Sequence, residues 1–70
     1  MKNEDLFERF KFAIEREYEA YEYYKSISEE SDDIVIKDIF ARMSKDEFEH
    51  RATIMGLYKK AKERSSDMSA

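Results

Sequence analysis

The 70-residue chain contains no cysteine, which removes several ways of stabilising a small protein. Disulfides are excluded, and so are thiolate zinc sites, iron–sulfur clusters and rubredoxin-type centres. A single domain of this length buries too little surface to be comfortably stable without a disulfide, a metal or self-association. Metal binding and oligomerisation therefore remain as the two ways of supplementing its core.

The chain also lacks long apolar runs and an excess of positive charge. No segment approaches the roughly 18 to 20 apolar residues needed to span a bilayer, and no signal-peptide core follows Met1. The 13 basic and 17 acidic residues are interspersed and give a net charge of −4. A nucleic-acid surface would need a clustered positive face. We therefore expect a cytoplasmic protein that binds neither membranes nor nucleic acid.

Helix-breaking residues are scarce, because proline is absent and the one glycine is Gly56. Apolar residues recur at alternating steps of three and four along two segments, which is typical of helices that bury one face. Between these segments lies a polar stretch, residues 28–33, which is rich in capping residues and predicts a turn. Asn3 is the predicted N-cap of the first helix, and Asp32 or Asp33 that of the second.

The predicted fold is all-α, an antiparallel hairpin of two long helices. The first helix is expected over about residues 3–29 and the second over about residues 33–64, which together form one domain, residues 1–64. Residues 65–70 are polar and are expected to form a tail.

Each predicted helix carries one continuous seam of core-facing positions. The first seam contains Phe7, Phe10, Ile14, Glu17, Tyr21 and Tyr24, widened on one flank by Leu6, Ala13, Ala20 and Ile27. The second seam contains Ile36, Phe40, Met43, Glu47, His50, Ile54, Leu57 and Ala61. Both seams are apolar apart from one polar break near the middle.

The polar breaks, Glu17 in the first seam and Glu47 with His50 in the second, are the candidate functional residues. Burying a lone carboxylate is costly, so a charge on a core face calls for a partner or a metal. Glu17 lies 15 residues before position 32 and Glu47 lies 15 after it. Both are therefore roughly 22 Å from the turn at 1.5 Å rise per residue, and an antiparallel hairpin brings them face to face.

Two helices bury only one stripe each, so a second copy related by a twofold axis is the simplest completion. The product is a four-helix bundle with two copies each of Glu17, Glu47 and His50 at mid-height. Four carboxylates and two imidazoles are the ligand set of di-iron and di-manganese bundles. Without metal, the four carboxylates would repel one another or have raised pKa values.

The segments 13–24 and 46–50 carry the patterns Glu17-x-x-Ala20-x-x-x-Tyr24 and Glu47-x-x-His50. In these patterns the chain resembles half-length ferritin-like proteins of the rubrerythrin type, including encapsulated ferritins. The resemblance extends over roughly residues 7 to 58. It implies a di-iron site assembled across a dimer, with ferroxidase or peroxide-reducing chemistry.

Carried over by position, Glu17, Glu47 and His50 match the ligands of that family, and Tyr24 matches a tyrosine next to the site. The chain departs from rubrerythrins proper, which carry both halves in one chain and a cysteine-rich electron-transfer domain. It departs from encapsulated ferritins because the polar residues 65–70 do not resemble their apolar targeting peptide. Neither a self-contained peroxidase cycle nor packaging in a larger compartment is therefore expected.

Three further residues are predicted to support the ligands: Tyr24, Tyr21 and Asp46. Asp46 lies one turn before His50 and can orient an imidazole N–H, as metal-bound histidines usually require. The alternative for the tyrosines is a plain core aromatic whose hydroxyl finds a hydrogen bond, and for Asp46 a surface carboxylate. Glu15 and Glu19 flank Glu17, so a rotation of the first helix would change which carboxylate points inward.

We therefore expect a homodimer, or a larger homo-oligomer, that binds two iron ions per dimer and oxidises Fe(II) with oxygen or peroxide. Manganese or zinc would fit the same ligands, giving a metal-binding bundle without redox turnover. A second class remains open: a non-catalytic hairpin that dimerises or binds a partner helix. In that case the polar layer would only set the alignment of the helices, as a buried asparagine does in a coiled coil.

Overall fold

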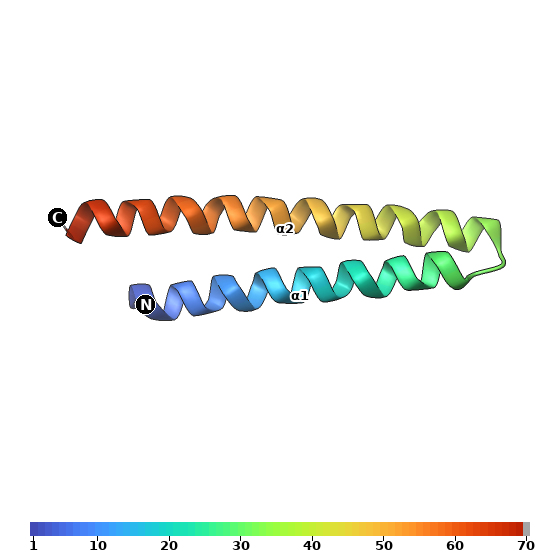
Figure 1. Ribbon diagram of the computed structural model, residues 1–70, viewed down its shortest axis with the longest axis horizontal. Coiled ribbons are helices and arrows are strands. Elements are labelled where there is room, and N and C mark those ends of the chain that lie inside the picture. The colour runs from blue at the N-terminus through green and yellow to red at the C-terminus, as the bar shows by residue number, and fades with distance from the viewer. Residues whose placement is uncertain (70) are drawn as a thin grey trace.

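The computed structural model describes residues 1–69, with side chains placed for residues 1–65. It contains two helices, α1 (Asn3–Glu30) and α2 (Ile34–Ser69), which run antiparallel as a hairpin (Figure 1). The rod measures 56 × 15 × 14 Å. Neither helix has a stretch long and apolar enough to cross a membrane within the described part of the chain. The predicted all-α hairpin is confirmed.

The second helix is longer than predicted, because it continues through residues 65–69, where we expected a polar tail. The physical reason is that no proline or glycine follows Arg64 to stop the helix. The Asn3 side-chain amide also donates to Ser65 Oγ at 2.9 Å, which ties this turn of α2 to the start of α1. The last predicted tail residue, Ala70, lies outside the described residues.

The N-cap prediction was wrong for α1 and correct for α2. Asn3 is the first helical residue, and Lys2 occupies the N-cap position without a side-chain capping bond. At the turn, Asp33 Oδ1 accepts hydrogen bonds from the backbone N–H groups of Val35 at 2.8 Å and Ile36 at 3.2 Å. These bonds satisfy two of the N–H groups that a helix start leaves free.

Two buried serines hold the helices close together. Ser28 Oγ donates to the carbonyl of Lys37 at 2.7 Å, and Ser44 Oγ donates to the carbonyl of Tyr21 at 3.2 Å. Their exposed fractions of 8% and 5% are the lowest among the described side chains. Because serine is short and bonds directly to the opposite backbone, the two helices can approach closely over this half of the rod.

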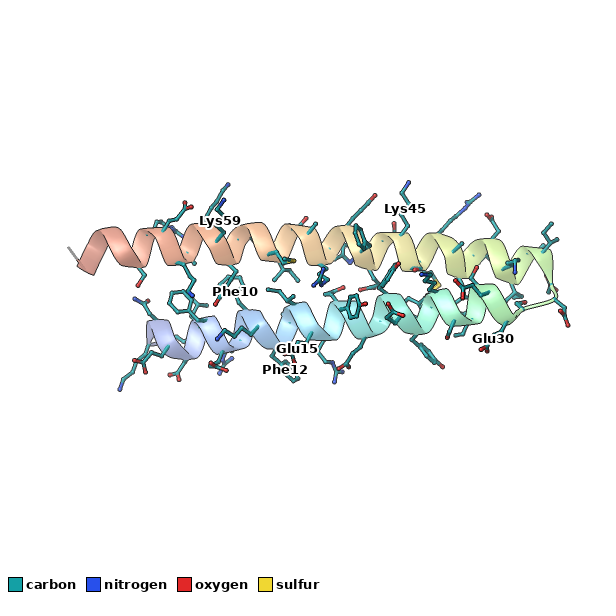
Figure 2. All side chains as sticks on the ribbon, in the orientation of Figure 1. Phe10, Phe12, Glu15, Glu30, Lys45 and Lys59 are labelled. Atoms are coloured by element: carbon teal, nitrogen blue, oxygen red, sulfur yellow. The ribbon has the colours of Figure 1, made fainter. Side chains whose placement is uncertain are left out.

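The hairpin covers only part of the predicted seams. In the first seam all six core positions are half-buried, whereas Ile36, His50 and Leu57 of the second seam remain exposed. Phe10 points between the helices and Phe12 points away from them (Figure 2). No hydrophobic side chain among residues 1–65 is fully buried. The single hairpin therefore has an open apolar side rather than a closed core.

Candidate metal centre

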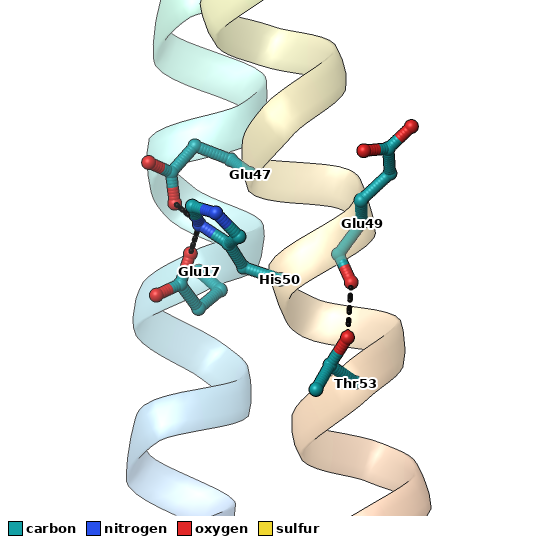
Figure 3. A network of polar contacts seen from close by, with 5 residues as sticks. All are labelled: Glu17, Glu47, Glu49, His50 and Thr53. Atoms are coloured by element: carbon teal, nitrogen blue, oxygen red, sulfur yellow. Dashed lines mark hydrogen bonds and ion pairs between the residues drawn. The ribbon is translucent and has the colours of Figure 1, made fainter.

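The side chains of Glu17 from α1 and of Glu47 and His50 from α2 converge (Figure 3). His50 Nδ1 lies 3.7 Å from Glu17 Oε2 and 3.8 Å from Glu47 Oε2. One ligand atom from each residue lies within 4.8 Å of the other two. Glu17 thus lies at the same level along the hairpin as Glu47 and His50, as the sequence predicted, although it is 30 or more positions away from them in the chain.

The three side chains differ in their exposure to solvent. Glu17 and Glu47 retain 26% and 22% of their side-chain exposure, whereas His50 retains 61%. The carboxylates therefore sit in the groove between the helices, and the imidazole lies at its outer edge. The cluster opens on the side of the rod that a single hairpin does not cover.

One of the carboxylate oxygens in the cluster lacks a hydrogen-bond donor. Glu17 Oε2 is buried without a hydrogen-bond partner, although a buried carboxylate oxygen normally has one. When both groups are ionised neither can donate to the other, but a protonated Glu47 can donate to Glu17. This hydrogen bond is the main cause that raises the pKa of Glu47, and burial and the negative charge of Glu17 raise it further.

This donor set fits a divalent transition-metal ion. Carboxylate oxygens and an imidazole nitrogen suit Fe, Mn and Zn. A cation at this position would give the orphaned Glu17 oxygen a partner and remove the repulsion between the two carboxylates. Three protein ligands leave coordination positions open to water or to further protein ligands.

The neighbouring acidic residues do not join the cluster. Glu15 and Glu19 are exposed and line a different hollow, together with Tyr18 and Arg51. The rotation of α1 therefore selects Glu17, as the seam predicts. Asp46 is exposed, and the described residues show no hydrogen bond or ion pair between it and His50. Its role as an orienting group stays a prediction.

The two tyrosines occupy different surroundings. Tyr24 is half-buried, with its ring 5.9 Å from that of Phe40 and 5.9 Å from that of Tyr23. Tyr21 instead packs against Phe48, with ring centroids 5.5 Å apart, in a groove that also contains Ser44. Both have the aromatic packing of core residues, and their roles beside the ligands stay predictions.

Sequence reasoning missed Arg51, which follows His50 directly. Its guanidinium lies 5.1 Å from the centre of the Tyr18 ring, and its Nε is buried without a hydrogen-bond partner. The available signal was the seven-residue spacing of Ser44, Arg51 and Tyr58, which places all three on one edge of the helix contact. A charged residue at such a helix position is easily mistaken for an exposed surface residue.

The sequence of the chain matches a known protein family. The family model described as Rubrerythrin matches residues 8–69, which is nearly the whole chain and includes all three candidate ligands. Searches of curated proteins and of solved structures found no match.

Proposed function

Since this chain belongs to the rubrerythrin family of di-iron, ferritin-like proteins, we propose that two copies bind iron between them and oxidise Fe(II) with oxygen or peroxide. The observation that carries the proposal is the convergence of Glu17, Glu47 and His50 within 4.8 Å. The buried, partnerless Glu17 oxygen supports it, because an acceptor of that kind is costly unless a cation or donor is present.

A second copy would complete the site. Two hairpins related by a twofold axis would contribute two Glu17 carboxylates from one pair of helices and two Glu47-x-x-His50 units from the other pair. This is the ligand arrangement of di-iron four-helix bundles. The 61% exposure of His50 in the single hairpin supports this arrangement, because the imidazole is free to face a partner.

The residues have distinct tasks in the proposed site. The four carboxylates balance the charge of two divalent cations, and as oxygen ligands they favour the ferric product. Each His50 would supply one nitrogen ligand. Iron held by these residues would supply one-electron chemistry, and the overall reaction balances as two Fe(II) oxidised and two protons taken from solvent for each oxygen reduced to peroxide, or for each peroxide reduced to two waters.

The test is to add Fe(II) in air to metal-free protein and to follow near-ultraviolet ferric absorbance together with oxygen uptake. The parent chain is expected to oxidise iron at least 10-fold faster than the double variant Glu47→Ala, His50→Ala. The matched control is Glu49→Gln, because Glu49 is exposed and points away from the cluster (Figure 3). It is expected to keep the parent rate.

Equal rates for the parent and the double variant would contradict the assignment of these ligands. Metal-dependent stabilisation without oxygen uptake would instead identify a redox-inert metal-binding bundle. A chain whose melting temperature does not respond to iron, manganese or zinc would be the non-catalytic hairpin module.

A further inference from the structure

A groove lies between α1 and α2 on the face of the rod that is turned away from the metal cluster. Its volume is about 410 Å³, which is within the range of small-molecule binding sites. Successive residues of a helix are rotated by roughly 100°, so Phe48 of the groove and His50 of the cluster project from nearly opposite sides of α2. A partner copy at the cluster would therefore leave this face uncovered. We call it the lysine groove, after Lys25 and Lys45 on its rim.

The base of the lysine groove is formed by Ser28 and Ser44, which are the two buried side chains of the hairpin among the described residues. Each Oγ already donates its proton to a carbonyl of the opposite helix, that of Lys37 at 2.7 Å or that of Tyr21 at 3.2 Å. A serine hydroxyl carries only one proton, so neither can donate to a ligand as well. An anionic group would therefore find no donor in these hydroxyls, and the base favours an apolar body.

The walls of the lysine groove are aromatic. The rings of Tyr21 and Phe48 have centroids 5.5 Å apart and are inclined by 54° to each other. Phe48 is 53% exposed, and the neighbouring wall residue, Ala41, contributes only a methyl group beside it. Aromatic rings attract one another in tilted or offset arrangements with centroids roughly 4.5 to 7 Å apart. A third ring placed in the groove can therefore pack against both walls.

The rim of the lysine groove carries a local positive charge, although the net charge of the chain is −4. Lys25 and Lys45 border the groove from opposite helices, and Glu29 is the acidic residue beside them. Glu29 follows Lys25 by one helical turn and offsets part of its charge. Lys45 makes no hydrogen bond or ion pair with the other described residues. The rim therefore offers one unpaired ammonium group to a ligand with one negative charge.

The ends of the lysine groove favour a small molecule over a partner helix. Toward the turn, Lys37 Nζ crosses from α2 to the carbonyl of Ser28 at 3.0 Å. In the other direction, the guanidinium of Arg51 crosses from α2 to within 5.1 Å of the centre of the Tyr18 ring. Both crossings lie just beyond the groove and limit its length. A long helix would have to displace them, whereas a ligand of one or two rings would not.

We propose that the lysine groove binds a small aromatic monocarboxylate. The ring of the ligand packs against Tyr21 and Phe48, over the apolar base. Its carboxylate lies at the rim, where it accepts hydrogen bonds from Lys45 and Lys25, which are stronger than those between neutral groups. A second negative charge on the ligand would be repelled by Glu29, which selects a single carboxylate. This binding site is separate from the metal cluster and does not depend on iron chemistry.

Isothermal titration calorimetry of the chain with 2-naphthoate tests the site, with saturable binding of one ligand per chain as the expected result. Lys45→Gln is expected to weaken the affinity about 10-fold, as for the loss of a hydrogen bond between charged groups. Ala41→Phe is expected to abolish binding, because its ring would occupy the space beside Phe48. Ala41 is exposed, so this substitution replaces no buried side chain, and circular dichroism checks that the helix content is unchanged.

Lys60→Gln is the matched control, because Lys60 borders a different apolar hollow, which it shares with Leu57 at the open end of the hairpin. This variant is expected to keep the parent affinity. Two further ligands separate charge from ring. The uncharged 2-naphthylmethanol should bind about 10-fold more weakly than 2-naphthoate, because it lacks the negative charge. Decanoate keeps the carboxylate but has no ring, and should also bind more weakly.

Several results would overturn the proposed site. They are the absence of saturable binding, equal affinities of the parent and Ala41→Phe, loss of affinity in Lys60→Gln, and tighter binding of decanoate than of 2-naphthoate. Affinity that falls as the chain concentration rises would show that another copy covers the groove, which would also overturn it. Since none of these readouts involves Fe(II) oxidation, failure of the groove and failure of the proposed function remain distinguishable.

Discussion

The carboxyl group of Glu47 lies beside an imidazole and a second carboxyl, that of Glu17, whose Oε2 is buried without a hydrogen-bond partner. The physical consequence is a raised pKa, caused first by the hydrogen bond that protonated Glu47 makes to Glu17 and then by burial. A cation and a proton are therefore alternative partners for the same pair of carboxylates. Metal affinity should fall in acid for that reason.

At the residue scale, the metal-free chain is predicted to lose stability as the pH rises from the ordinary Glu47 pKa of 4.5 through its higher folded value. The folded state holds the Glu47 proton more tightly than the unfolded state. The stabilisation that this proton contributes is therefore complete below pH 4.5 and is lost as the pH rises above it. Glu17→Gln should flatten this dependence on pH. The glutamine amide carries no charge to repel ionised Glu47, and its N–H can donate a hydrogen bond to it. Urea unfolding between pH 4 and pH 8 in the presence of a chelator measures both slopes.

The matched control is Glu19→Gln, which changes an exposed carboxylate on the same helix. It should keep the parent slope. The Glu17→Gln chain should also be more stable than the parent at pH 7 without metal, yet gain less stability when metal is added. An identical pH dependence in parent and Glu17→Gln would show that the two carboxyls do not interact.

Helical periodicity predicted which of Glu15, Glu17 and Glu19 lies beside Glu47 and His50, whereas the role of these residues as metal ligands stays a prediction. The buried serines and Arg51 were not predictable in the same way. A serine bonded to an opposite carbonyl and a serine bonded to water look alike in a sequence, since the difference lies in the neighbouring helix. The buried serines and Arg51 were therefore missed because their contacts are made by the opposite helix.

At the scale of elements, the turn fixes the alignment of α1 against α2 and so the coincidence of Glu17 with Glu47. Asp33 begins α2 by accepting two backbone hydrogen bonds. Lys37 Nζ reaches back to the carbonyls of Ser28 at 3.0 Å and Glu29 at 3.4 Å, near the end of α1. One short segment therefore caps both helices.

Asp33→Ala is predicted to destabilise the chain by about 1 kcal/mol, the usual loss for removing an N-cap side chain. Asp32→Ala is the control and should change stability by less than about 0.5 kcal/mol, as for an ordinary surface position. Urea unfolding at one fixed protein concentration gives both values. A loss of equal size at the two positions would mean that general charge at the turn, rather than the Asp33 cap, is responsible.

The end of α2 shows why element boundaries are hard to predict. Residues 65–70 are all polar or small apart from Met68, so the composition favoured a tail beginning after Arg64. The helix instead continues to Ser69, and at residue 65 it is held by a side-chain bond from Asn3. A contact between residues 62 positions apart leaves no local trace in the sequence.

At the scale of the whole molecule, the hairpin leaves part of its predicted core seams uncovered. The seam positions that stay exposed in the single chain, Ile36, His50 and Leu57, recur at intervals of seven and fourteen. The apolar pattern of a sequence reflects burial in the final assembly, whether the contact comes from the same chain or from another. The pattern thus predicted more burial than one hairpin provides.

We propose that metal binding and dimerisation are one event, because two hairpins together would supply the four carboxylates and two imidazoles of a di-iron site. The most direct test is an anaerobic Fe(II) titration of the metal-free chain followed by native mass spectrometry. The account predicts that iron appears in dimers, or in multiples of dimers, at two ions per two chains, and that monomers carry none. A monomer that binds iron as tightly as the dimer, or a dimer of the Glu47→Ala, His50→Ala chain that still takes up two ions, would contradict it.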